Sequence, residues 1–313
     1  MKRLFIIGLI LCLVWFTAGC ESMKEDGRPK VMVILKTLSS QYWKFVEAGA
    51  KEAAKKLNVD VTIVGPSSEA KIDEQISLLE DAITQEPDAL VVSPSQPVTV
   101  IPAFEMAKKK KIPVLLVDTD ADWDDKVTFL GTDNYTAGKK GGEQLASMLK
   151  PGDKVAIIAG ALGNTAMDHR VKGAKEVLQA KGIKVVAEQP ADSDKEKALS
   201  VMENILQKNP DIKGVFSAND DMAIGALRAL EARKLKIPVI GTDGTIEALE
   251  SIQAGNLSGT IAQNPYQMGY KGVETALKAI RKEKVSKRID TGVDVITRKN
   301  AQKKMNFLKG LLD

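Results

Sequence analysis

Two stretches of the sequence follow one pattern, Lys111-Ile-Pro-Val-Leu-Leu-Val-Asp118 and Lys236-Ile-Pro-Val-Ile-Gly-Thr-Asp243. Each is an apolar run that starts after Lys-Ile-Pro and ends on an aspartate. A second matched pair lies upstream, Glu86-Pro-Asp-Ala-Leu-Val-Val-Ser93 and Asn209-Pro-Asp-Ile-Lys-Gly-Val-Phe-Ser217, separated from the first by a segment of helical spacing. This repeat predicts two related domains in tandem.

Short apolar runs alternate with helical segments along the rest of the chain. The predicted strands are 31–35, 61–64, 89–92, 114–117, 155–158, 185–186, 214–216 and 239–240, and the predicted helices include 45–57, 72–84, 170–181, 198–208 and 222–233. Continuous apolar runs suit strands that are buried on both faces of a parallel sheet. Alternating strands and helices imply right-handed crossovers with helices on both faces. The predicted fold class is therefore α/β, with two doubly wound parallel-sheet lobes.

The first twenty residues predict export. Met1-Lys2-Arg3 is positively charged, residues 4–16 are almost wholly apolar, and small residues precede Cys20. This is the layout of a signal peptide, and the apolar stretch is shorter than the ~20 residues that span a bilayer. Thr17-Ala18-Gly19-Cys20 resembles a bacterial lipobox, so 1–19 is predicted to be a signal peptide and 20–30 a lipidated tether. The alternative is an ordinary signal peptide with an incidental cysteine.

The composition excludes several classes of site. The only other cysteine, Cys12, lies in the signal, so thiol catalysis and Cys-based metal sites are excluded. His169 is the only histidine, so a His metal cluster or a Ser-His-Asp triad is hard to build. Without Lys2 and Arg3, 43 basic and 41 acidic residues remain, which gives a net charge of +2. The charges are interspersed and form no basic stripe for nucleic acid. No phosphate-binding loop motif is present. We expect no metal, no cofactor and no nucleic-acid partner.

Polar residues stand directly after four predicted strands: Ser93, Asp118, Asn219 and Asp243. In open α/β sheets, ligands bind at the carboxyl ends of the strands. If the two domains face each other, these side chains converge on one cleft.

The candidate residues suit a ligand rich in hydroxyl groups. Asp118 and Asp243 accept hydrogen bonds, Arg170 donates several, and Asn219 and Gln263 do both. Tyr42-Trp43 is expected to be an exposed aromatic pair that stacks on a sugar ring. The alternatives are interdomain packing for the aromatic pair, a surface position for Arg170, and a glycosidase that uses the two aspartates as its carboxylate pair.

The chain resembles the ribose- and allose-binding class of periplasmic binding proteins, which share their fold with the ligand-binding part of lactose-repressor-type regulators. The resemblance covers about residues 30–300. Its specific segments are Gln-Pro-Ala-Asp at 189–192, Ser-Ala-Asn-Asp-Asp-Met-Ala-Ile-Gly-Ala-Leu-Arg-Ala-Leu at 217–230, Ile-Gly-Thr-Asp-Gly-Thr at 240–245 and Gly-Thr-Ile-Ala-Gln-Asn-Pro at 259–265.

The resemblance implies a ligand site. Positions that match the family's sugar contacts are Tyr42, Trp43, Asp118, Arg170, Asn219, Asp243 and Gln263. Four positions depart from the pattern: Ser40 and Ser93 stand where ribose binders have Asn, Thr119 stands where they have Arg, and Ser193 replaces an aromatic residue. These departures disfavour ribose itself. Family members also bind galactose, xylose, inositol-like polyols and the furanose signal autoinducer-2.

The resemblance also implies a layout. The N-terminal lobe would comprise 31–132 plus 264–291, and the C-terminal lobe 133–263 plus 292–313. Crossings near Thr132, Gln263 and Gly292 would form a three-strand hinge.

The implied function is that of a substrate-binding lipoprotein for an ABC importer. It would be a monomer, not an enzyme, anchored through lipid in a bacterial cell envelope, with the importer's membrane subunits as partners. The alternative is a sensor that presents its ligand to a chemoreceptor or histidine kinase. A lactose-repressor-type regulator is disfavoured because a signal peptide occupies the place of its helix-turn-helix.

Overall fold

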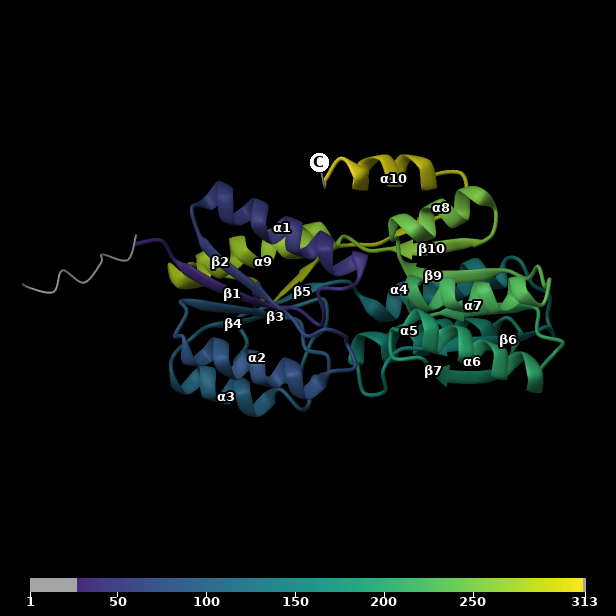
Figure 1. Ribbon diagram of the computed structural model, residues 1–313, viewed down its shortest axis with the longest axis horizontal. Coiled ribbons are helices and arrows are strands. Elements are labelled where there is room, and N and C mark those ends of the chain that lie inside the picture. Colours follow the sequence, from purple (N-terminus) through teal and green to yellow (C-terminus); the bar gives the residue numbers. More distant parts are fainter. Residues whose placement is uncertain (1–26, 312–313) are drawn as a thin grey trace, which may run out of the picture.

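The computed structural model describes residues 27–311 as two α/β lobes arranged along the long axis of the molecule (Figure 1). Cys20 and the predicted signal peptide lie outside the described residues. The N-terminal sheet consists of β1 (Lys30–Ile34), β2 (Asp60–Val64), β3 (Ala89–Val92), β4 (Val114–Val117), β5 (Phe129–Gly131) and β11 (Arg288–Asp290). The C-terminal sheet consists of β6 (Lys154–Ala159), β7 (Lys184–Pro190), β8 (Gly214–Ser217), β9 (Val239–Asp243), β10 (Gly259–Ala262) and β12 (Asp294–Ile296).

Both sheets have the same strand order, which confirms the predicted fold class. The N-terminal order is β2-β1-β3-β4-β5-β11, and the C-terminal order is β7-β6-β8-β9-β10-β12. Each lobe is therefore a doubly wound sheet whose order reverses beside its first strand, between β1 and β3 or between β6 and β8. The prediction of parallel sheets fails at one edge, because β12 pairs with β10 antiparallel. The chain enters β12 from the other lobe, so no helical crossover sets its direction.

Helices cover both faces of each sheet. In the N-terminal lobe, α1 (Gln41–Leu57) and α9 (Pro265–Ile280) lie on one face and α2 (Ile72–Thr84) and α3 (Ile101–Lys109) on the other (Figure 1). In the C-terminal lobe, α4 (Asn134–Ala146) packs beside α5 (Thr165–Ala180), α6 (Lys195–Lys208) beside α7 (Asp220–Ala232), and α8 (Ile246–Ala254) beside α10 (Ala301–Lys309). In this described region, no helix is both long and apolar enough to span a membrane.

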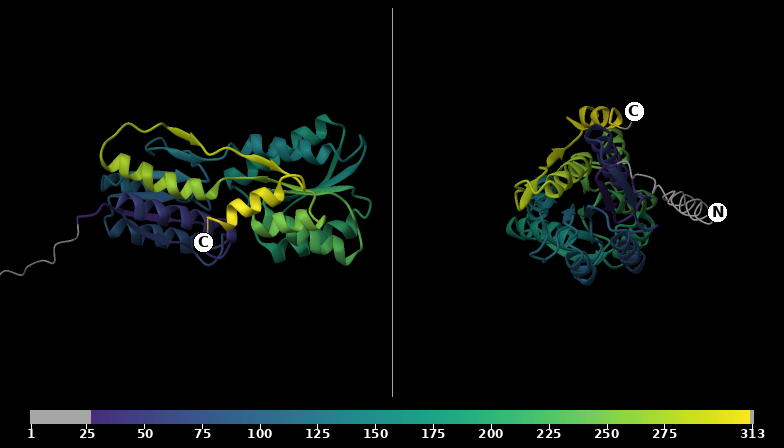
Figure 2. Two further views of the ribbon diagram at one scale, coloured as in Figure 1. Left: turned by 90° about the horizontal axis from the view of Figure 1, so that it is seen from above. Right: turned by 90° about the vertical axis from the view of Figure 1, so that its left-hand side faces the viewer.

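Three segments join the lobes: the residues between β5 and α4, between β10 and α9, and between β11 and β12. In Figure 2 the second and third of these segments, coloured yellow-green and yellow, run from one lobe to the other. Asn264 Nδ2 donates a 2.6 Å hydrogen bond to the carbonyl oxygen of Thr291, which ties two of the segments together. These crossings fall where the three-strand hinge was expected, near Thr132, Gln263 and Gly292.

The lobes are closed on each other. Ser40 Oγ donates to Asp221 Oδ2 at 3.0 Å, and Thr165 Oγ1 donates to the carbonyl oxygen of Asp120 at 3.0 Å. Asn164 Nδ2 also donates to the carbonyl oxygen of Ser95 at 2.9 Å. These bonds lie at separate places between the two lobes, so they hold the facing strand ends together.

Several helices begin earlier than their apolar spacing predicts, because polar residues cap them. Helix α5 begins at Thr165, where Asn164 accepts a hydrogen bond from the backbone N–H of Met167. Asp194 and Asn219 cap α6 and α7 in the same way. Such caps satisfy backbone donors that have no partner within the helix.

The paired helices α1 and α9 approach closely through glycine. A β-carbon on Gly269 would overlap the carbonyl oxygen of Val46, and one on Gly49 would overlap that of Tyr266. The C-terminal lobe repeats the arrangement, since a β-carbon on Gly138 would overlap the carbonyl oxygen of Arg170. In each lobe, glycine thus allows two helices to pack closely. One is the helix of the first crossover, α1 or α5, and the other is the helix that begins where the chain enters from the other lobe, α9 or α4.

We expect Gly269→Ala to lower the free energy of unfolding by about 1–3 kcal/mol, because the overlap forces α9 away from α1. The gain in helix propensity, about 0.5–1 kcal/mol, is too small to offset this. Urea unfolding measures the change. Gly310→Ala is the control, since a β-carbon there would lie 3.6 Å from its nearest neighbour. Equal stability of the two variants would contradict the predicted overlap.

Candidate functional site

Asp118 is the centre of the N-terminal half of the site. It follows β4, and its Oδ1 accepts a 2.8 Å hydrogen bond from the Tyr42 hydroxyl. Its Oδ2 accepts from Lys36 Nζ at 2.9 Å, from Thr119 Oγ1 at 2.9 Å and more weakly from Ser93 Oγ at 3.4 Å. Lys36, Ser93 and Thr119 follow β1, β3 and β4, so the carboxyl edge of the sheet brings them together, and Tyr42 reaches Asp118 from α1.

The neighbouring charges keep Asp118 ionised. Burial pushes the pKa of Asp118 upward, but the Lys36 ammonium and the Arg170 guanidinium outweigh it and hold the pKa below its ordinary value. Arg170 belongs to the other lobe, so its effect shows that the two halves of the site are close enough to interact electrostatically. Burial and the nearby carboxylates raise the pKa of Tyr42, so its hydroxyl keeps its proton and donates a hydrogen bond to Asp118.

Arg170 is the centre of the C-terminal half. Its side chain is 1% exposed, which excludes the alternative of a surface helix residue. Nη1 lies 3.1 Å from Asp243 Oδ1 and donates to the carbonyl oxygen of Ala218 at 2.8 Å, while Nε donates to Asn134 Oδ1 at 2.7 Å. Gln263 Nε2 donates to the same Asp243 Oδ1 at 2.7 Å. Three further residues, Asn134, Ala218 and Gln263, thus hold this ion pair in place.

Asp243 differs from Asp118 in the direction in which its pKa is shifted. Burial raises the pKa of Asp243 well above its ordinary value, although the Arg170 guanidinium acts in the opposite direction. Asp220 adds to the rise by its own negative charge. Asp220 is itself buried, which raises its pKa to about 6. Its Oδ2 accepts from the backbone N–H groups of Gly244 and Thr245, so it fixes the turn that carries Asp243.

Both central aspartates have unusual backbone conformations. Asp118 has a φ of 63° and Asp243 a φ of 134°, and Ser193 has a φ of 59°. Residues other than glycine rarely adopt positive φ, and such positions concentrate at functional sites, where the surroundings hold them. Here the hydrogen bonds to each carboxylate supply that constraint.

The structure corrects the expected exposure of Tyr42-Trp43. Both lie in the first turn of α1, with Tyr42 5% and Trp43 2% exposed, and their rings pack edge to face at 5.1 Å. Trp43 Nε1 donates to Glu69 Oε1 at 2.7 Å. The pair is part of the N-terminal core because helix α1 begins four residues earlier than predicted and turns both rings toward the sheet.

The remaining predicted residues occupy two kinds of place. Asn219 caps α7, where its Oδ1 accepts from the backbone N–H of Met222 at 2.9 Å. Ser40 and Ser193 lie farther out and line a cavity of about 420 Å³ at the mouth between the lobes, together with Glu69. We refer to the buried residues Asp118, Arg170, Thr242, Asp243 and Gln263 as the polar floor of the site. Ser40 and Ser193 lie outside it, on the wall of this cavity.

Some polar atoms in the floor have no hydrogen-bond partner among residues 27–311. They include Gln263 Oε1 and Thr242 Oγ1. A buried polar group without a partner costs about 1–3 kcal/mol, so native proteins rarely leave one unexplained. A ligand with hydroxyl groups would supply the missing donors and acceptors.

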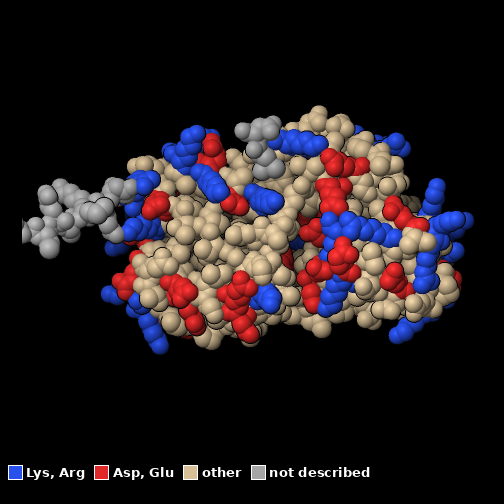
Figure 3. Space-filling model, in the orientation of Figure 1, with Lys and Arg blue, Asp and Glu red and all other residues tan. Residues whose placement is uncertain are grey.

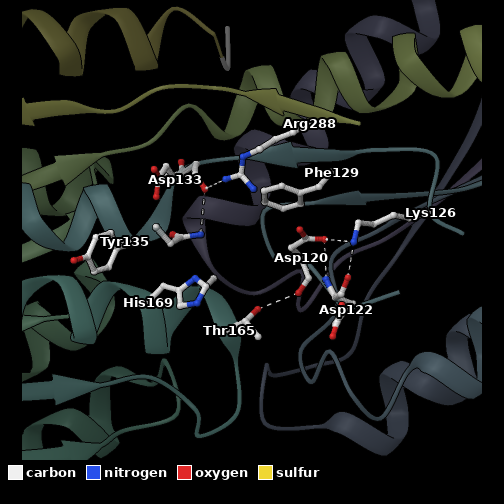
Figure 4. A pocket seen from close by; sticks show the side chains of 13 residues that line it. Asp120, Asp122, Lys126, Phe129, Asp133, Tyr135, Thr165, His169 and Arg288 are labelled. Atoms are coloured by element: carbon white, nitrogen blue, oxygen red, sulfur yellow. Dashed lines mark hydrogen bonds and ion pairs between the residues drawn. The ribbon is translucent and has the colours of Figure 1, made fainter. Parts of the chain in front are cut away.

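A second cavity, of about 460 Å³, lies beside the hinge (Figure 4). Its side chains come from both lobes, but none of the predicted ligand residues lines it. The polar groups there largely pair with one another: Lys126 Nζ lies 3.1 Å from Asp120 Oδ1, and Arg288 stacks on Phe129 at 4.8 Å. His169, the only histidine, lines this cavity rather than the polar floor.

Sequence reasoning missed Lys36, Glu69 and Thr242. Lys36 directly follows the predicted strand 31–35, as Ser93 and Asp118 follow theirs, so the same rule would have found it. Glu69 lies in a loop whose path to Trp43 no local pattern indicates. Thr242 lies inside the Ile-Gly-Thr-Asp segment and directly precedes Asp243, which the sequence did identify as a site residue.

Charges are mixed on the face drawn in Figure 3, where Lys and Arg are interspersed with Asp and Glu. That distribution agrees with the absence of a basic stripe in the sequence. Among the described residues, no group of three His, Cys, Asp or Glu side chains could hold a metal ion.

Comparison with known proteins adds the family. The family model for the periplasmic binding protein domain matches residues 31–284 of this chain. The chain is 36% identical to the ribose import binding protein RbsB of Bacillus subtilis, over 96% of this chain and 100% of that protein. It is 35% identical to the D-allose-binding periplasmic protein of Escherichia coli, over 90% of each.

A solved structure is similar as well. The carbohydrate transporter solute-binding protein of Agrobacterium radiobacter in complex with D-arabinose superposes with a TM-score of 0.85 at 33% identity, covering 92% of this chain and all of that one. The family and these relatives are sugar-binding transport proteins rather than enzymes. With its two equally ordered sheets and a polar site between them, the chain belongs to the periplasmic binding protein family.

Proposed function

We propose that this protein is the substrate-binding lipoprotein of an ABC importer and that it holds a monosaccharide or similar polyol between its closed lobes. The observation that carries the proposal is the pairing of two buried ion pairs, Lys36–Asp118 in one lobe and Arg170–Asp243 in the other. They stand at the carboxyl ends of both sheets, where open α/β sheets bind ligands. The proteins compared above, which bind sugars, support the ligand class.

Closure gives such a ligand its effect on the protein. A ligand that contacts both lobes binds the closed state more tightly than the open state. It stabilises the closed state by the difference between these two binding free energies. In this proposal, Gln263 Oε1 and the Arg170 guanidinium contact the ligand from one lobe. Asp118 and the side chains bonded to it contact the ligand from the other lobe. The closed form, anchored through Cys20, is then the form that the importer's membrane subunits recognise.

The short side chains at four positions indicate which ligand fits. Ser40, Ser93, Thr119 and Ser193 reach less far than the residues that ribose binders carry there. The hydroxyls of Ser93 and Thr119 also donate hydrogen bonds to Asp118, and the hydroxyl of Ser40 donates one to Asp221. The proposed ligand is therefore larger than ribose or differently decorated.

Isothermal titration calorimetry against a panel of pentoses, hexoses and polyols tests the ligand class. We expect at least one member to bind in a one-to-one complex, because the unpaired polar atoms of the floor match hydroxyl groups. The panel should include D-ribose, D-allose and D-arabinose. Tight binding of an amino acid or a nucleoside with no response to any sugar would contradict the proposal.

Replacing Arg170 tests the site. We expect Arg170→Ala to weaken binding of the ligand found in the panel by at least about tenfold, because the ligand loses donors and Asp243 is left buried without its cation. Arg228→Ala is the matched control, since Arg228 lies on α7 with 45% of its side chain exposed. Thermal unfolding of each variant separates lost binding from lost fold. Unchanged affinity in Arg170→Ala would remove Arg170 from the site.

Cys20→Ser tests the anchor. We expect the native chain to fractionate with membranes in bacteria and the variant to be recovered in the soluble fraction, because the serine hydroxyl cannot be processed as a lipobox cysteine. Mass spectrometry of the native amino terminus should find an acylated Cys20. Membrane association that survives the substitution would argue against lipidation. Crosslinking of the native chain to its membrane partner would distinguish an importer from a chemoreceptor or histidine kinase.

A further inference from the structure

Helix α8 begins beside the cavity at the mouth, and its first backbone donors are bonded from both lobes. Thr245 Oγ1 accepts a 3.3 Å hydrogen bond from the backbone N–H of Ala248 within the C-terminal lobe. The backbone N–H of Ile246, the first residue of the helix, donates to Gln41 Oε1 of the N-terminal lobe at 2.6 Å. The first four N–H groups of a helix have no acceptor within the helix. Gln41 therefore helps to cap a helix that belongs to the other lobe.

The start of α1 places Gln41 in this position. Gln41 is the first residue of α1, and Ser40 is the N-cap residue before it. Ser40 makes no side-chain capping bond to its own helix, and its hydroxyl donates to Asp221 Oδ2 across the cleft at 3.0 Å. Two adjacent residues of the N-terminal lobe thus bind the first turns of α7 and α8.

Gln41 separates the effect of closure from the effect of ligand contact. Its side chain bonds to a backbone N–H of the other lobe, a donor that is the same for every ligand. Ser40 is less informative, because it is itself a predicted ligand residue and because Asp221 also lies 3.9 Å from Lys195 Nζ. When the lobes rotate apart, Gln41 and Ile246 separate and bond to water instead. The loss of one such bond changes an equilibrium constant by about two- to tenfold.

We infer that Gln41 is a positioning residue that stabilises the closed protein by capping α8 from across the cleft, and that it thereby slows release of the bound ligand. Release requires the lobes to separate, so it requires the bond between Gln41 and Ile246 to break. Entry of a ligand into the open protein does not require this. The statement about ligand release rests on the proposed function, whereas the statement about closure stands without it.

The test measures release of the tightest-binding sugar of the calorimetric panel by stopped-flow fluorescence. We expect Gln41→Met, which keeps the length of the side chain and removes the acceptor, to raise the dissociation rate constant by about two- to tenfold. The association rate constant should not fall. Gln267→Met is the matched control, because Gln267 is an exposed glutamine in the first turn of α9. It should release the sugar at the native rate.

A second variant removes the donor instead of the acceptor. Ile246→Pro lacks the backbone N–H, and proline is well tolerated as the first residue of a helix. Thr245, the residue before it, has φ −66° and ψ 155°, the extended conformation that a following proline favours. Ile246→Pro also changes packing, but a double-mutant cycle isolates the bond. We expect Gln41→Met to speed release in the native background and to have little effect in the Ile246→Pro background.

The outcomes distinguish this inference from the proposed function. A native dissociation rate in Gln41→Met, or the same acceleration in both backgrounds, would overturn the inference while sugar binding stands. If no sugar or polyol binds, the proposed function fails, and closure is tested by small-angle X-ray scattering of the protein alone. The Gln41→Met protein should then be more extended than the native protein, and identical scattering curves would overturn the inference as well.

Discussion

The need to keep two buried ion pairs hydrogen-bonded constrains this structure more than any other interaction. Removing a carboxylate and a cation from water costs several kcal/mol for each ion, and the attraction between them offsets this only when further hydrogen bonds are in place. Arg170 therefore also binds Asn134 and the carbonyl of Ala218, and Asp118 also binds Tyr42 and Thr119. The strand ends, the helix caps and the strained aspartate backbones all serve this arrangement.

The doubly wound order explains why the two pairs face each other. Lys36 and Ser93 follow the two strands that flank the reversal of strand order in the N-terminal lobe. Asp118 follows the next strand, β4, and Asp243 ends the equivalent strand, β9, in the C-terminal lobe. The hinge segments bring the two carboxyl edges together. In the closed structure both ion pairs are buried. A ligand that satisfies the remaining donors and acceptors reduces that penalty, which is the physical basis for coupling ligand binding to closure.

Much of this could be predicted from the sequence, because strand ends are marked by a change from apolar to polar residues. The apolar runs located Ser93, Asp118 and Asp243, and the structure places each where its strand predicts. The burial of Tyr42 and Trp43 could not be predicted in this way, because it depends on where α1 begins. The contact between Trp43 and Glu69 joins a helix to a distant loop, and only the folded chain reveals it.

The repeat in the sequence hides a chemical difference between its two halves. Each half ends an Ile-Pro-Val run on an aspartate, and both aspartates are buried beside a cation. The pKa of Asp118 is nevertheless lowered and that of Asp243 raised. Lys36 and Arg170 both act on Asp118, whereas Asp243 has one cation beside it and the negative charge of Asp220 behind it. Two copies of one fold thus hold their central aspartates in different charge surroundings.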